Sequence, residues 1–142
     1  LRKYDRNKIL YVLVSQRFIP QFLSGYNAAK DLKAEYEKFT EKYLVERCNL
    51  KLTETEKQWN YFENLYAENN DNQKIDLKNY DLSQTEFDEG ELGEIGKSSL
   101  QIRDSVIIEN IYEAFQNNDI VFIVFGAAHL LAERPTLEKL FE

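Results

Sequence analysis

The chain has 142 residues, of which 43% are hydrophobic and 30% charged, so it is long enough to bury one core of ordinary size. A net charge of -7 makes nucleic acid and anionic membrane surfaces poor partners, because both attract clustered Lys and Arg. No apolar run reaches the roughly 18 residues of a membrane-spanning helix. The single cysteine, Cys48, excludes an intrachain disulfide and a multi-cysteine zinc site, and we interpret it as a small buried apolar group.

The first predicted helix spans residues 5–25. Within it, residues 9–14 (ILYVLV) could by themselves form a strand or part of a buried helix. The apolar pattern continues without turn residues as far as Pro20, which favours a helix. Proline lacks the N–H of a helical hydrogen bond, so we expect Pro20 to bend or interrupt this helix, with the junction between residues 17 and 20.

A second helix is predicted for residues 27–48, ending near Asn49. Its apolar residues recur at spacings of four, three and four: Leu32, Tyr36, Phe39 and Tyr43. An aromatic stripe at this spacing is typical of core or partner-facing packing rather than of a cofactor site. The sequence TETE at residues 53–56 has the spacing of a capping box and predicts the start of a third helix that forms a hairpin with the second. Residues 1–68 are therefore predicted to form a helical subdomain.

The next stretch, residues 69–97, is polar and acidic, and we expect it to be a flexible connection. Four of its side chains could donate oxygen ligands to a hard cation: Asp88, Glu89, Glu91 and Glu94. They lack the regular spacing of a calcium-binding loop, which favours a solvated acidic loop. A mobile lid over a cleft is the functional alternative, suggested by three glycines in this stretch.

Residues 98–142 are predicted to form a helix, a strand and a short helix. Ser98 and Gln101 have capping-box spacing and are expected to open a helix of about twenty residues. Five apolar side chains of that helix would face a core: Leu100, Ile107, Ile111, Ala114 and Phe115. Residues 120–125 (IVFIVF) are typical of a strand buried on both faces. The last helix is expected to begin near Pro135.

The strongest candidate for a functional residue is His129, the only histidine. It follows the predicted strand and the small residues Gly126 to Ala128, at the strand end where open α/β sheets bind ligands. An imidazole there could bind a metal or haem iron, or exchange a proton with a substrate. Arg103 could hold a carboxylate, a propionate or an oxyanion, although an ion pair with Asp104 is an equally good structural explanation. Asn110 shares a helix face with Arg103 and is the weakest candidate.

These residues together resemble the C-terminal half of the superfamily that includes TraB, Tiki, ChaN and erythromycin-esterase-like proteins. The resemblance rests on Arg103-Asp104 near the start of a helix, Asn110 seven residues after Arg103, the apolar strand, and the sequence GAAH at residues 126–129 followed by Glu133-Arg134-Pro135. It covers about a third of the chain. Members carry a first G-x-x-H, usually with a nearby glutamate, after an early strand, and a second after a late strand. Only the second is present here.

The resemblance implies a helix-dominated α/β fold in which the C-terminal helix-strand-helix unit belongs to a larger, mainly parallel sheet. The chain begins at Leu1 and contains no methionine, so we expect it to be part of a longer protein, with all three sections in one larger domain. A missing N-terminal half or a companion chain would then supply the other histidine and the glutamate. Homo-oligomerisation is left open.

Three functions are consistent with these expectations. By resemblance, the first is a metal-dependent hydrolase, with a peptidase as one option. Its catalytic residues would be His129 and Arg103, its metal ligand His129, and its ligand-binding residues Gly126 and Asn110. The second is a haem- or iron-binding protein of the ChaN type. The third is a noncatalytic interaction module that presents its Tyr/Phe stripe to a partner. The sequence alone does not choose between a divalent metal, haem and no cofactor.

Overall fold

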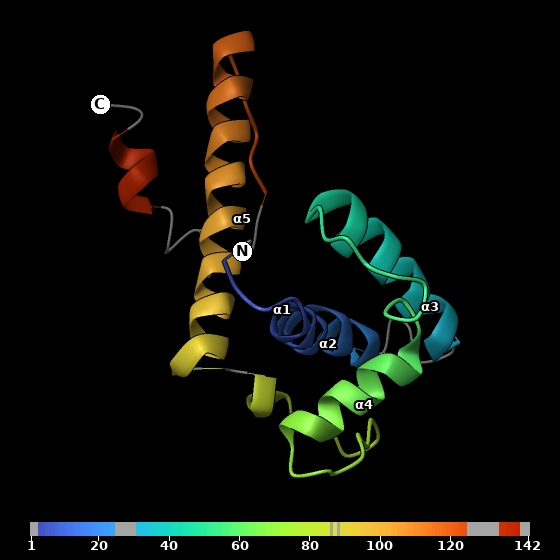
Figure 1. Ribbon diagram of the computed structural model, residues 1–142. Helices are drawn as coiled ribbons and strands as arrows, with labels where there is room; N and C mark the ends of the chain where they lie inside the picture. Colours follow the sequence, from blue (N-terminus) through green and yellow to red (C-terminus); the bar gives the residue numbers. More distant parts are fainter. Residues whose placement is uncertain (1–2, 25–30, 86, 88, 125–133, 140–142) are drawn as a thin grey trace. The chain divides into compact units, whose positions relative to one another are not determined.

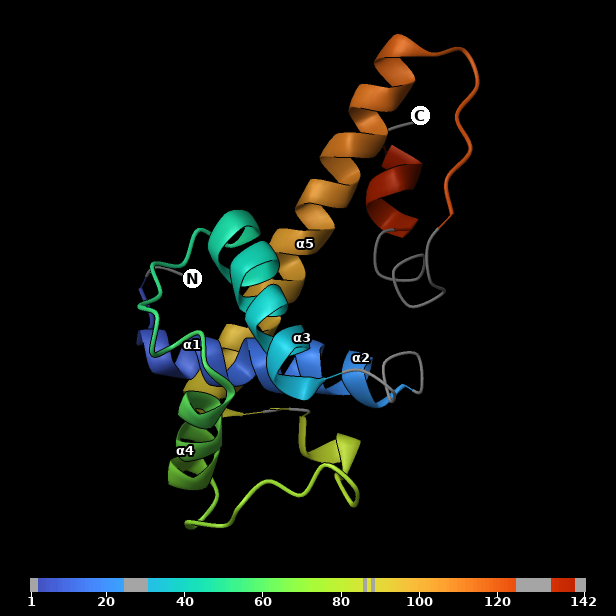
Figure 2. The same cartoon turned by 90° about the vertical axis from the view of Figure 1, so that its right-hand side faces the viewer.

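The computed structural model describes residues 3–24, 31–85, 87, 89–124 and 134–139 of the chain. The described residues are mainly helical and include no strand, so the predicted helix dominance is confirmed, whereas the predicted sheet is not seen in this part of the chain. The chain divides into two compact units, Leu1–Gly96 and Lys97–Glu142. Figures 1 and 2 show the helices from two directions.

The predicted first helix forms, and it runs through three segments: α1 (Arg6–Leu13), the π-helix η1 (Val14–Phe18) and α2 (Ile19–Leu23). Asp5 caps its start, because its side chain accepts hydrogen bonds from the backbone N–H groups of Asn7 and Lys8. Within the predicted junction the helix changes from π to α geometry, between Phe18 and Ile19, and it continues through Pro20 without an interruption. A widened π turn ends directly before the α2 segment that contains the proline, as expected where a helix must accommodate a residue without an N–H.

The predicted second helix also forms, as α3 (Leu32–Phe39) followed by the π-helix η2 (Thr40–Arg47). Asp31 caps α3 by accepting a hydrogen bond from the backbone N–H of Lys33 at 3.0 Å. The helix ends at Arg47, close to the expected end, and Asn49 just beyond it adopts a left-handed φ of 53°. The following N–H, of Leu50, donates to the carbonyl of Leu44 at 2.9 Å and closes the helix end.

The capping box at residues 53–56 forms, but it does not open a helix as predicted. Glu56 accepts hydrogen bonds from both the backbone N–H and the hydroxyl of Thr53, and its own N–H donates to the Thr53 hydroxyl. The residues between Glu54 and Lys57 form turns, and α4 (Trp59–Asn69) begins after Gln58. The reciprocal hydrogen bonds therefore stabilise a turn that leads into α4.

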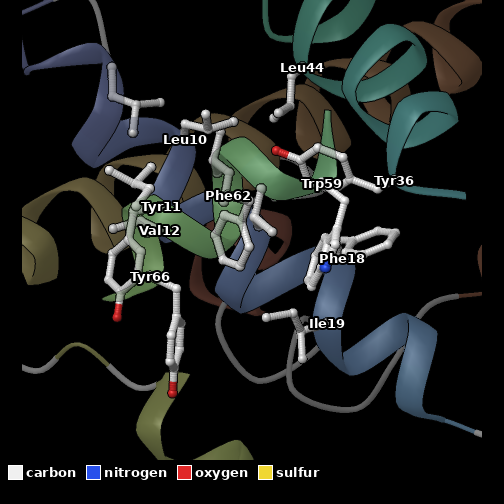
Figure 3. Packing of buried hydrophobic residues seen from close by; sticks show 14 of the residues in the cluster. Leu10, Tyr11, Val12, Phe18, Ile19, Tyr36, Leu44, Trp59, Phe62 and Tyr66 are labelled. Atoms are coloured by element: carbon white, nitrogen blue, oxygen red, sulfur yellow. The ribbon is translucent and has the colours of Figure 1, made fainter. Parts of the chain in front are cut away.

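The core of the first unit is aromatic, and it forms where α1, η1, α3 and α4 meet (Figure 3). All of residues 9–14 are buried, which confirms the interpretation of this run as a buried helix. Tyr36 of α3 packs edge-on against Trp59 of α4, with ring centroids 5.3 Å apart, and Phe18 contacts both rings. The predicted packing of α3 against α4 is thus confirmed, and the aromatic stripe belongs to the core.

The polar connection is not solvated throughout. Four of its apolar side chains pack against the core of the first unit: Ile75, Leu77, Tyr80 and Phe87. The ring of Tyr80 lies 6.2 Å from that of Tyr66 in α4, and the ring of Phe87 lies 5.5 Å from that of Tyr11 in α1. Burial raises the pKa of Tyr80 to about 12. A short 3-10 helix, η3 (Leu82–Thr85), lies between these two anchoring side chains.

The long helix α5 (Gly90–Asn117) begins eight residues before the predicted start at Ser98. The prediction was wrong here because three glycines between residues 90 and 96 lower the intrinsic helix propensity of this stretch. Tertiary contacts override that propensity, since Ile95 is fully buried in the core of the first unit and Leu92 packs against it. The last eight residues of the predicted flexible connection are therefore helical.

After α5, residues 120–124 carry no strand assignment, and most of their side chains are exposed. The exposed fraction alternates: Ile120 is 76% exposed, Phe122 91%, Ile123 39% and Val124 98%. The burial expected for a central strand is therefore not found in these residues. Residues 134–139 are helical, in agreement with the short helix predicted near Pro135. Among the described residues, no helix is both long and apolar enough to span a membrane.

Candidate functional site

Helix α5 presents the candidate residues Arg103 and Asp104 on one partly buried face. Four apolar side chains further along the helix lie on the same face: Ile107, Ile108, Ile111 and Phe115. Ile111 is buried and the other three are half-buried, as the sequence predicts for Ile107, Ile111 and Phe115. Leu100, which was expected to face a core as well, is 41% exposed. The candidate pair thus lies on the less exposed side of the part of α5 that follows residue 100.

The two side chains of the candidate pair are close but do not form a tight ion pair. The Arg103 Nε and the Asp104 Oδ1 are 3.8 Å apart, with exposed side-chain fractions of 34% and 22%. At this distance the carboxylate lowers the positive electrostatic potential around the guanidinium.

Asn110 occupies the expected position on α5, seven residues after Arg103, which places the two residues on the same side of the helix. Its side chain is exposed, whereas that of Arg103 is half-buried. The structure therefore brings Arg103 and Asp104 together and leaves Asn110 at the edge of their face.

The other candidate residues, His129 and Gly126, lie outside the described residues. The described part of the structure therefore includes neither the proposed metal ligand, His129, nor the proposed ligand-binding residue, Gly126. Within the part that is described, no group of three or more His, Cys, Asp or Glu side chains could hold a metal ion. A complete metal site would need ligands beyond these residues.

The acidic residues of the connection have structural partners in the first unit. Glu91 forms an ion pair with Lys8 of α1. Glu94 accepts a hydrogen bond from the hydroxyl of Tyr4 at 3.4 Å. Glu89 is exposed, and Asp88 lies outside the described residues. Glu91 and Glu94 therefore attach the start of α5 to the N-terminal segment rather than forming a cation-binding loop.

The most buried carboxylate among the described residues is Glu56, which the sequence analysis interpreted only as a capping residue. Its Oε1 lies 2.6 Å from the Arg6 guanidinium, and its Oε2 accepts both hydrogen bonds from Thr53. Burial alone would raise the pKa of Glu56, but the hydrogen bonds from Thr53 and the charge of Arg6 outweigh it and lower the pKa. With both oxygens engaged, this carboxylate is structural. Arg6 showed no sequence signal, because its partner lies 50 residues away.

Cys48 packs at the edge of the core, and burial raises the pKa of its thiol. A raised pKa keeps the thiol protonated near neutral pH, which disfavours nucleophilic or metal-binding chemistry. The interpretation of Cys48 as a small apolar side chain agrees with its position.

The chain matches no family model, no curated protein and no solved structure.

Proposed function

We propose that this chain supplies the C-terminal portion of a TraB/Tiki/ChaN-like domain that acts as a metal-dependent hydrolase, with peptides among its candidate substrates. In this proposal the active site is composite. His129 and Arg103 come from this chain, and the second histidine and the glutamate come from an N-terminal half or a companion chain. The fold would be α/β, with residues 120–125 forming a strand of a larger, mainly parallel sheet.

The exposure of residues 120–124 is the observation that carries this proposal. These five residues are all apolar, yet Ile120, Phe122 and Val124 are each more than three-quarters exposed. Water does not favour such a surface, and burying it would stabilise the protein by about 25 cal/mol for each Å² removed from solvent. A strand that is apolar on both faces is typical of the middle of a parallel sheet, where it has neighbours on each side. Those neighbours would be provided by the companion half.

The partly buried pair on α5 gives the proposed site an anion-binding group. Arg103 is half-buried, so its charge is less screened by water than that of a fully exposed arginine. Its guanidinium could bind a substrate carboxylate or stabilise the oxyanion that develops during hydrolysis. Asp104 would orient the guanidinium, and Asn110 would lie at the margin of the site.

His129 would complete the site after the apolar segment. With the histidine and glutamate of the companion half, its imidazole could hold a divalent metal, which when bound supplies a water molecule activated for attack on a carbonyl. The small residues Gly126, Ala127 and Ala128 would let a substrate approach closely. This chain contains one histidine, so the proposal requires the companion.

The test is a hydrolysis assay on the complete protein together with any companion that purifies with it. Chromogenic peptide and ester substrates would be assayed with Zn²⁺, Mn²⁺, Co²⁺ or Fe²⁺ and with a chelator. We expect hydrolysis that depends on the metal. His129→Ala should reduce it by at least about a hundredfold, because the substitution removes a ligand of the metal. Arg103→Ala should reduce kcat/KM by about ten- to a hundredfold.

Two variants serve as matched controls. Arg134→Ala removes an exposed arginine whose Nε pairs with Glu138 at 2.7 Å, and it should leave hydrolysis unchanged. Asn117→Ala removes an exposed asparagine from α5, whose side-chain amide donates to the carbonyl of Glu113, and provides the comparison for Asn110→Ala. Hydrolysis that survives His129→Ala with native circular dichroism would overturn the assignment of the site.

A haem-binding function is the second candidate, favoured by the same exposed apolar segment together with Arg103. A porphyrin offers apolar faces to side chains such as Phe122 and Val124, and its propionates suit a guanidinium. Titration with hemin should then produce a Soret shift that His129→Ala abolishes and Arg134→Ala preserves. Absence of both hydrolysis and the Soret shift would leave a noncatalytic interaction module. That module would not use the Tyr/Phe stripe, because the stripe belongs to the core.

A further inference from the structure

Helix α5 has two possible start positions, one observed in the structure and one indicated by the sequence. The observed helix begins at Gly90. The sequence also contains a serine and a glutamine with capping-box spacing at Ser98 and Gln101, which would begin the helix eight residues later. In the observed helix Ser98 lies in the interior, where a capping serine has no capping function.

The eight residues between the two starts include three poor helix formers. Three of the seven residues from 90 to 96 are glycines, and glycine is disfavoured in helices because of its large conformational freedom in the unfolded chain. Gly90 itself has a φ of +66°, a conformation that other residues rarely adopt. Local propensity therefore favours a start at Ser98, and contacts with the core must favour the start at Gly90.

Those contacts come from the first unit. Ile95 is fully buried in the core, and Leu92 is partly buried against it. Glu91 pairs with Lys8 and Glu94 accepts a hydrogen bond from Tyr4. Gly96 lies so close to Gln16 that an added Cβ would be 3.0 Å from the side-chain amide nitrogen. A larger residue at position 96 would therefore require the end of the Gln16 side chain in η1 to shift by a few tenths of an ångström.

We propose that residues 90–97 are a docking-dependent extension of α5. While Leu92 and Ile95 are docked on the core, the extension is helical. When they undock, it unwinds, and the helix begins at Ser98 with its capping box formed. The division between the two compact units falls between Gly96 and Lys97, at the end of the extension. Unwinding would therefore be confined to the residues before this division and would leave residues 100–117 helical.

Hydrogen exchange measured by mass spectrometry or NMR tests the proposal on the full chain. Ile95→Ala should accelerate exchange of the amides of residues 92–97 by about tenfold or more, because it removes a buried anchor, and should leave residues 104–115 unchanged. Ile102→Ala is the matched control, since it truncates an isoleucine that is 49% exposed on the same helix. It should not accelerate exchange in residues 92–97.

A milder pair of variants covers the case in which Ile95→Ala unfolds the first unit. The first variant is Leu92→Ala, and the second combines Glu91→Gln with Tyr4→Phe. Both weaken the docking of residues 90–97 and leave Ile95 in place. Each should accelerate exchange in residues 92–97 more than in residues 9–14. The proposal is overturned if residues 92–97 exchange only together with residues 9–14, or if residues 104–115 lose protection to the same extent.

The capping box provides an independent measurement. In the Ile95→Ala or Leu92→Ala background, Ser98→Ala should accelerate exchange at Leu100 and Gln101 several-fold, because these are the N–H groups that a capping serine would satisfy. In the otherwise unchanged protein the same substitution should have a clearly smaller effect on these two amides. An equal effect in both backgrounds would contradict a second helix start at Ser98.

Discussion

Two apolar runs of six residues, ILYVLV at residues 9–14 and IVFIVF at residues 120–125, have similar compositions but different environments. The first is helical, and every one of its side chains is buried. In the second, the described residues carry no regular secondary structure, and most of their side chains are exposed. The hydrophobic effect requires a surface to pack against, and α3 and α4 provide one for the first run within the chain. The comparison suggests that the second run depends on neighbours from elsewhere.

The largest expected difference between the two regions is in the cost of removing a phenylalanine. Phe62→Ala, in the aromatic core, should lower the free energy of unfolding by about 3–5 kcal/mol, because it leaves a cavity among packed rings. Phe122→Ala should change it by less than about 0.5 kcal/mol. Urea denaturation followed by circular dichroism measures both values. A large cost for Phe122→Ala in the isolated chain would show that this run is already packed.

A smaller effect is expected when a hydroxyl group replaces a methyl group. Val12→Thr should cost about 1–3 kcal/mol of stability, because the hydroxyl is buried in the core of the first unit. Val124→Thr should be nearly neutral, since Val124 is 98% exposed. The same denaturation experiment, repeated with the companion half present, sharpens the comparison. There, Val124→Thr should become destabilising or weaken assembly if residues 120–125 enter a sheet.

The smallest effect concerns pH and the buried carboxylate of Glu56, in the turn before α4. The pKa of Glu56 is lowered in the folded protein, so its contribution to stability is present above its ordinary pKa of 4.5 and is lost as the pH falls through its lower native pKa. Glu56→Gln should cost about 1 kcal/mol near neutral pH, and the difference from the unchanged protein should shrink below about pH 4. Denaturant titrations between pH 3 and pH 7 measure this difference.

Residues 120–124 contain no ionisable side chain, so the pH dependence should arise in the first unit and not in this run. A Glu56→Gln variant whose stability deficit does not vary between pH 3 and pH 7 would mean that folding does not lower the pKa of this carboxylate. Arg6→Gln is a useful companion variant, because it removes the other member of the ion pair and leaves the hydrogen bonds from Thr53.

The sequence predicted the helices of the first unit well, because each has a local signal. Asn49 lies just after the end of η2, as expected, and the aromatic stripe identifies the buried side of α3. Two start sites were wrong for opposite reasons. The capping box at residues 53–56 forms in a turn ahead of α4. Helix α5 begins at Gly90 despite its glycines, because tertiary contacts compensate for weak propensity.

Of the candidate site residues, the structure describes Arg103 and Asn110, both on α5, and Arg103 lies near Asp104 as the alternative structural explanation expected. The sequence could not predict the separation of 3.8 Å between Arg103 and Asp104 or the exposure of Asn110, which depend on burial and rotamers. The pairing of Arg6 with Glu56 was missed as well, because no local pattern connects residues 50 positions apart. His129 and Gly126 lie outside the described residues, so their roles stay predictions.

By itself, the sequence determined the helical periodicity, most of the helix ends and the apolar character of the two six-residue runs, because these depend on side chains within a few residues of one another. Only the tertiary structure decided which apolar run is buried, where α5 begins and which partners the acidic side chains have. Burial and ion pairing join residues that are far apart in the chain, and their free energy depends on the surfaces that folding brings together.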